Sequence, residues 1–210
     1  MSLQSQEILT EAHELSESVI SSMHDFDPEL LSRLQSDTVV LTRRFEYNRN
    51  LEDLTKAISI TRRALASPIL GTRKWKFQQL LGIQLGYLFQ KTEKKDDIEA
   101  AITSLQAAVE VERLSPADKA VSLDEYGKVL FARFKLNNKK ADLEQAIKVY
   151  KEALEIWGSE NDSIVSCMNN LGNAMVTMFE MTADPRELPS DNHSSYGRPR
   201  RTGTFSSHFS

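Results

Sequence analysis

The residue types most often used for nucleophilic and metal chemistry are few and scattered in this sequence. They are one cysteine and four histidines: Cys167, His13, His24, His193 and His208. No group of His, Cys and carboxylate residues has the spacing of metal ligands. The residues around Cys167, Ser-Cys-Met-Asn-Asn, do not resemble those around a peptidase nucleophile, and a lone cysteine on a helix is more often a small buried apolar residue. We therefore expect no catalytic residue, no metal and no cofactor, and a protein that is not an enzyme.

Phosphate binding is not indicated either. The pattern G-x-x-x-x-G-K-[S/T], whose backbone N–H groups cradle phosphates, does not occur in the sequence. Gly82 and Gly86 are four residues apart in a stretch with helical periodicity, where glycines more often permit close packing of helices. The remaining patterns concern how helices are arranged.

The strongest of these patterns is a repeat. Phenylalanine recurs at intervals of 44, 45 and 45 residues, by subtraction of the positions Phe45, Phe89, Phe134 and Phe179. Glycine recurs at Gly82, Gly127 and Gly172, each 45 residues after the one before. After each of the first three phenylalanines the sequence reads D-[L/I]-x-x-A-I-x5-A-[L/V], starting at Asp53, Asp97 and Asp142. The chain is therefore an array of repeated units.

Each unit is predicted to be a pair of antiparallel helices, called here its first and second helix, because the links between them are short and polar. The expected pairs are 28–46 with 51–66, 73–90 with 95–112, and 116–135 with 139–157. A further first helix is expected at about 161–181, and an amphipathic helix over 3–23 that caps the array.

Two recurring residues have predicted structural roles. The phenylalanine follows a recurring Leu or Met by one helical turn, so we expect it in the core between the two helices of its unit. The recurring aspartate is expected just before the second helix, where a carboxylate caps free backbone N–H groups and meets the positive end of the helix.

The array resembles the tetratricopeptide repeat (TPR) in a long form of about 44 residues. The resemblance rests on the glycine of the first helix and on two alanines seven residues apart in the second, as at Ala101 and Ala108, and it covers roughly residues 28–188. It implies an all-α fold, a right-handed α-α superhelix of about three complete helix pairs plus one unpaired helix. Thr38 replaces the glycine in the first unit, so looser packing is expected there.

The resemblance also implies a division of the chain. Residues 1–26 form the capping helix and loop, and 27–182 the repeats, with units at 27–70, 71–114, 115–159 and a partial unit at 160–188. Glu187 and Leu188 still fit the pattern, but Asp191 and Arg198 stand where the alanines belong, and Pro189 interrupts the expected second helix. Residues 189–210 are rich in Ser, Pro, Gly and Arg, which predicts a disordered tail.

The last helix is expected to lack a second helix of its own. Its apolar residues, which the third unit cannot cover completely, are Val165, Met168, Leu171, Met175, Met178 and Phe179. Natural arrays usually end in a polar surface, and methionine-rich surfaces adapt to varied partners. The end is therefore either a docking surface, including one for self-association through helix 161–181, or the result of truncation after Leu188.

In proteins similar to this array, first helices line a concave groove that accepts an extended peptide or a partner helix. The positions carried over to this sequence are Gln79, Ile83, Asp124, Lys128, Asn169 and Asn173. Two asparagines four residues apart on a helix can hold the backbone of an extended peptide. The alternative is that these are ordinary solvent-facing residues. Gln79 and Asp124 do not suit a clamp for a C-terminal carboxylate.

We therefore interpret the chain as a protein-protein interaction scaffold. The alternative is a fragment of a larger repeat protein whose caspase-like peptidase or nucleotide-binding domain lies elsewhere, as in fungal arrays of similar sequence. With 30 acidic against 26 basic residues, nucleic acid is not an expected partner. No apolar run approaches the length of a membrane span, and the polar N-terminus is unlike a signal peptide, so we expect a cytoplasmic protein that contacts no membrane.

Overall fold

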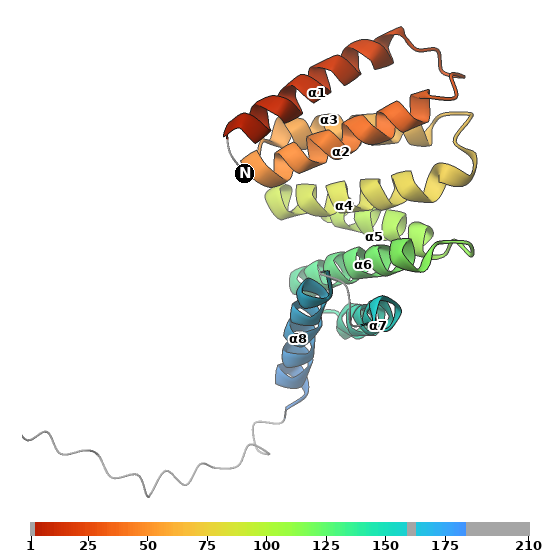
Figure 1. Cartoon of the computed structure of the whole chain (residues 1–210). Helices are drawn as coiled ribbons and strands as arrows, with labels where there is room; N and C mark the ends of the chain where they lie inside the picture. The colour runs from red at the N-terminus through yellow and green to blue at the C-terminus, as the bar shows by residue number, and fades with distance from the viewer. Residues whose placement is uncertain (1–2, 159–162, 184–210) are drawn as a thin grey trace, which may run out of the picture.

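The computed structural model describes residues 3–158 and 163–183, and their regular structure is entirely helical (Figure 1). The helices are α1 (Leu3–Ser22), α2 (Leu30–Asn48), α3 (Leu51–Leu65), α4 (Lys74–Thr92), α5 (Lys95–Val109), α6 (Pro116–Asn137), α7 (Lys140–Trp157) and α8 (Ser163–Thr182), with a short 3₁₀ turn, η1 (Gly71–Arg73), before α4. Their ends fall within a few residues of the predicted ranges. The all-α class is thereby confirmed, and the tail expected over 189–210 lies outside the described residues.

Helices adjacent in the chain pack as pairs, α2 with α3, α4 with α5, and α6 with α7. The first helices α2, α4, α6 and α8 also contact one another in this order, while α1 packs against α2. In Figure 1 the pairs are stacked from α1 at one end to α8 at the other. The helix α8 contacts α7 and α6, and no further described helix follows it.

The recurring phenylalanines Phe45, Phe89 and Phe134 are buried, as predicted, between the helices of their units. Their carbonyl oxygens also end the first helices. Each accepts the N–H of the residue four positions later, which has a left-handed backbone: Arg49, Glu93 and Asn138. The phenylalanine thus marks both the core of a unit and the end of its first helix.

The recurring glycines lie where the second helix comes closest. A Cβ atom on Gly82 would lie 2.4 Å from Leu105 Cγ, and one on Gly127 would lie 2.5 Å from a ring carbon of Tyr150. The two alanines of each second helix are fully buried, which agrees with the close approach. In the first unit, Thr38 instead meets Thr61: their hydroxyls are 2.8 Å apart, and Thr38 also donates to the Ala57 carbonyl.

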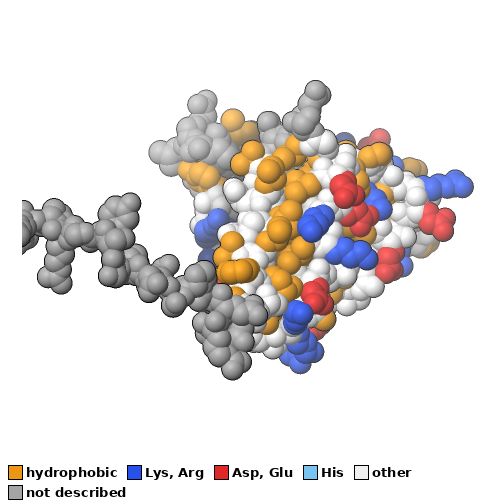
Figure 2. Space-filling view, turned by 90° about the horizontal axis from the view of Figure 1, so that it is seen from below, with side chains coloured by type: hydrophobic (Ala, Val, Ile, Leu, Met, Phe, Trp, Pro, Cys, Tyr) orange, Lys and Arg blue, Asp and Glu red, His pale blue; other side chains and the backbone are white. Residues whose placement is uncertain are grey.

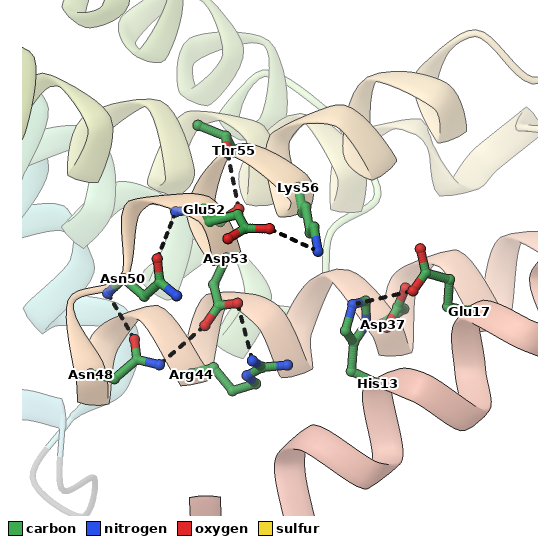
Figure 3. Close-up of polar contacts among 10 residues, drawn as sticks. All are labelled: His13, Glu17, Asp37, Arg44, Asn48, Asn50, Glu52, Asp53, Thr55 and Lys56. Atoms are coloured by element: carbon green, nitrogen blue, oxygen red, sulfur yellow. Dashed lines mark hydrogen bonds and ion pairs between the residues drawn. The ribbon is translucent and has the colours of Figure 1, made fainter.

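The recurring aspartates do not cap the second helices, so that prediction was wrong. Asp53 is the third residue of α3, and the capping residue is Asn50, whose side chain accepts from the Glu52 N–H. The Asp53 carboxylate instead accepts from Asn48, at 3.2 Å, and pairs with Arg44, at 3.3 Å (Figure 3). It therefore ties the end of the first helix to the start of the second.

The same connection recurs in the other units. Asp97 accepts a hydrogen bond from Thr92, and Asp142 accepts two from Arg133, at 2.9 and 2.7 Å. Asn48, Thr92 and Asn137 each also accept the backbone N–H two residues later, across the turn. A carboxylate in the first turn still meets the positive end of the helix dipole. The aspartate is structural, but through side-chain contacts that its sequence position alone did not specify.

Candidate functional site

The predicted groove residues lie on three first helices. Gln79 and Ile83 are half-buried on α4, and the Gln79 amide donates to Ser122 Oγ on α6 at 2.7 Å. Asp124 is buried on α6, whereas Asn169 and Asn173 are exposed on α8. The amide that joins α8 to α6 is that of their neighbour Asn170, which donates to Asp124 Oδ1 at 3.4 Å.

Lys128 is surrounded by carboxylates of its own helix. Its Nζ lies 2.8 Å from Asp124 Oδ2 and 2.9 Å from Glu125 Oε1. Burial opposes the charged form, but the attraction of the two carboxylates outweighs it and raises the pKa of Lys128. Burial also raises the pKa of Glu125, against the effect of Lys128. The charge of Lys128 is thus compensated within α6.

A second polar cluster joins α2 to α4 on the same side of the units. Tyr87 donates to Glu46 Oε1 at 2.8 Å, and Arg43 pairs with Glu46 Oε2 at 2.7 Å. Burial raises the pKa of Tyr87, and the hydrogen bond to Glu46 acts in the same direction. The tyrosine therefore remains a protonated donor at neutral pH, and this cluster fixes α4 against α2.

Between α4 and α6 the surface is hollowed. The depression has a volume of about 560 Å³. Its apolar lining is Phe89, Phe131, Ala132 and Leu136, and its polar lining is Gln90, Glu93, Lys128 and Lys135. An adjoining hollow of about 130 Å³ contains Ile83, Gly86 and Glu125 and shares Gln90, Lys128 and Ala132 with it. The two together form one surface, called here the α4–α6 groove.

The structure brings two of the six predicted residues, Ile83 and Lys128, to the α4–α6 groove. Sequence analysis did not single out Lys135 and Leu136, one turn beyond Phe131. Lys135 Nζ lies 4.4 Å from the centre of the Phe131 ring, and Leu136 is an exposed leucine near the end of α6. An apolar residue at the exposed end of a first helix is the signal that would have pointed to it.

Cys167 lies on the buried side of α8 and is fully buried, and its thiol lies 3.7 Å from the Tyr150 carbonyl oxygen on α7, to which it donates. Burial raises the pKa of this thiol to about 12, so it is protonated at neutral pH and a poor nucleophile. Over residues 3–158 and 163–183, no group of three or more His, Cys, Asp and Glu side chains could hold a metal ion. No helix in these same ranges has the length and apolar character to cross a membrane.

The burial of Cys167 predicts slow reaction with thiol reagents. Because it is the single cysteine of the sequence, labelling with a chromogenic disulfide reports on one site. In mildly alkaline buffer we expect labelling at least about 100-fold slower in the folded protein than after unfolding in guanidinium chloride, since reaction requires local opening of α8. The double variant Cys167→Ala, Ser166→Cys places the thiol at an exposed neighbouring position and should react as fast as the unfolded chain. Equal rates for folded and unfolded wild type would contradict the buried position.

Comparisons with protein-family models, with curated proteins and with solved structures found no match to this chain.

Proposed function

We propose that this chain is a TPR-like α-solenoid and serves as a non-catalytic, cytoplasmic scaffold that binds a peptide or a partner helix along its first helices. The α4–α6 groove is the observation that carries the proposal. The larger of its two hollows has a volume of about 560 Å³, which lies in the range of ligand sites, and it combines apolar side chains with polar and charged groups, as such sites do. Under this proposal the stacked pairs form a right-handed superhelix with the groove on its concave side.

The repeat contacts support the TPR-like arrangement. Units two and three each place a glycine of the first helix against a large side chain of the second, Leu105 or Tyr150. The spacing between glycine and large residue is the same in both units, so the pairs pack in the same way. A regular pair geometry is what a solenoid requires, because each unit contacts chiefly its neighbours.

The lining of the groove indicates the chemistry of the ligand. Phe131 and Leu136 offer apolar surface for a large aliphatic or aromatic side chain. Lys128 is compensated by Asp124 and Glu125, so Lys135 is the better partner for an acidic residue beside that anchor. The expected ligand is therefore a segment with one large apolar residue followed or preceded by a carboxylate.

The proposal can be tested with a substitution that fills the groove and leaves the core unchanged. Peptides selected from a displayed random library against the whole protein would be measured by fluorescence anisotropy. Ala132 is half-buried and lines both parts of the groove, so Ala132→Trp should weaken binding at least about tenfold, or about 1.4 kcal/mol. Ala117→Trp makes the same change at an exposed position of the same helix and should leave affinity unchanged.

If Ala132→Trp leaves the affinity unchanged, or if both tryptophan variants weaken binding equally, the α4–α6 groove is not the site. If Ala132→Trp does weaken binding, the double variant Asn169→Ala, Asn173→Ala shows whether the ligand extends from the groove to α8. A further loss of affinity places part of the ligand on α8, as the sequence pattern predicts.

A further inference from the structure

The helix α8 buries one side and exposes the other. Cys167 and Ala174 are buried against the preceding pair. The apolar residues Val165, Met168, Met175 and Phe179 are 66%, 57%, 48% and 62% exposed, respectively. We call these four residues with Gly172 the open face of α8. Figure 2, a view from the α8 end, shows hydrophobic side chains forming a band across the molecule.

The open face corresponds to a face that is covered elsewhere in the same molecule. Subtracting the repeat of 45 residues from its apolar positions gives Ala120, Leu123, Leu130 and Phe134 of α6. These are only 0%, 1%, 2% and 4% exposed. Their helical spacing puts them on the face of α6 that carries Gly127, against which Tyr150 of α7 packs. The open face of α8 is therefore the face that a second helix covers in the complete units.

Gly172 provides an independent observation. At Gly82 and Gly127 a Cβ atom would collide with the second helix, but at Gly172 it would meet nothing within 4 Å. Glycine in the interior of a helix is less favourable than alanine, so nothing within α8 accounts for it. A helix approaching as closely as α5 and α7 approach their partners would account for it.

The C-terminal end of α8 also lacks a contact that the second helix provides in the complete units. Thr182 occupies the position of Asn137 and Thr92, whose side chains hydrogen-bond to the aspartate of the second helix. In α8 the Thr182 hydroxyl instead donates to the Met178 carbonyl oxygen of its own helix, at 2.9 Å. The Thr182 hydroxyl is therefore a hydrogen-bond donor at the position where the acidic residue of an added second helix would accept one.

These contacts define the occupant of the open face. It is a helix with an acidic residue in its first turn, two alanines seven residues apart, and a large side chain eight residues after the acid, which packs over Gly172 as Leu105 and Tyr150 pack over their glycines. The second helices of another copy have this pattern, but their alanines, such as Ala101 and Ala146, are fully buried within their own units. The sequence after Thr182 has Asp191 and Arg198 at the alanine positions.

We propose that the open face of α8 binds a helix of this chemistry supplied by another protein, which completes the fourth unit in trans. Binding buries the exposed methionines and Phe179 and places a large side chain against Gly172. The proposal does not depend on the α4–α6 groove, since it concerns the face of α8 that a second helix would cover.

The molecule itself supplies the probe. A fluorescent peptide with the sequence of residues 138–158, which contains α7 with Ala146, Tyr150 and Ala153, would be titrated with the full-length protein. We expect saturable binding, followed by anisotropy and by a gain in helical circular dichroism. Gly172→Leu should weaken it at least about tenfold, because the added side chain occupies the space of Tyr150. A peptide with both alanines changed to leucine should bind at least as weakly.

Three controls keep the result interpretable. Ser166→Leu places the same side chain at an exposed position of α8 that corresponds to none of the α6 residues buried by α7 in unit three, and should leave peptide affinity unchanged. Slow labelling of Cys167 in Gly172→Leu would show that α8 remains docked. Ala132→Trp, which fills the α4–α6 groove, should not affect this peptide, so that failure of one site does not imply failure of the other.

The absence of saturable binding, or equal binding by wild type and Gly172→Leu, would overturn the proposal. So would a dimer of the full chain in sedimentation experiments that Gly172→Leu dissociates, because the open face would then belong to a second copy.

Discussion

Replacing Phe134 by alanine is expected to lower the free energy of unfolding by about 3–5 kcal/mol. Phe134 is buried in the core of unit three, and its ring stacks on that of Phe131 with centroids 6.1 Å apart. Removing the ring leaves a cavity that the packed helices α6 and α7 can close only in part. The matched variant is Phe179→Ala, one repeat later, where the side chain is largely exposed. That change should cost less than about 0.5 kcal/mol.

Urea denaturation would measure both variants, with circular dichroism and the fluorescence of Trp75 and Trp157 as separate probes. Coincident transitions are needed before the midpoints are converted to free energies, because repeat arrays can unfold in parts. A similar loss for Phe134→Ala and Phe179→Ala would mean that α8 is covered in solution, contrary to the structure described here.

The second large effect is expected at the contact between Gly127 and Tyr150. Gly127→Thr should lower the free energy of unfolding by about 2–3 kcal/mol, because a Cβ atom there would lie 2.5 Å from the Tyr150 ring. Tyr150→Thr alone should cost about 2–4 kcal/mol through the cavity that it leaves. The double variant recreates the pair Thr38 and Thr61 of the first unit, whose hydroxyls hydrogen-bond. It should cost less than the sum of the single changes by about 1–3 kcal/mol.

A double-mutant cycle in urea measures this coupling directly. Gly172→Thr is the control for the intrinsic effect of the substitution in a helix. It should be neutral or slightly stabilising, because no atom outside α8 contacts that position within 4 Å and threonine has a higher helix propensity than glycine. Strict additivity of Gly127→Thr and Tyr150→Thr would show that the two residues do not determine each other's size.

The sequence repeat predicted only part of the candidate site, because the residues that line the α4–α6 groove do not all recur with the period of the repeat. The repeat placed Ile83 and Lys128 on first helices, and the structure brings both to the α4–α6 groove. It also placed Asn169 and Asn173 on α8, where they are exposed on a helix whose contact with α6 is made by Asn170. The register of a helix is set by its own hydrophobic pattern, but its rotation against a neighbour is set by which side chains pack between them.

The recurring aspartates likewise combine a position that the sequence predicts with contacts that only the structure shows. Their spacing indicated a structural residue at the start of every second helix, but not its partners. Asp53, Asp97 and Asp142 bind side chains at the end of the preceding helix. The partners are an arginine and an asparagine in units one and three, Arg44 with Asn48 and Arg133 with Asn137, but Thr92 in unit two. Since a carboxylate accepts from more than one type of donor, threonine takes the place of asparagine in unit two.

Over the described residues, the sequence by itself determined the number and approximate limits of the α-helices, the pairing of first with second helices, and the burial of Phe45, Phe89 and Phe134. These follow from short links and a hydrophobic period, which act locally. Only the tertiary structure decided which side of α8 is exposed, that Gly172 has no neighbour, and that a hollow lies between α4 and α6. Those properties depend on the distance between helix surfaces, and that distance is set by pairs of side chains far apart in the chain, such as Gly127 with Tyr150.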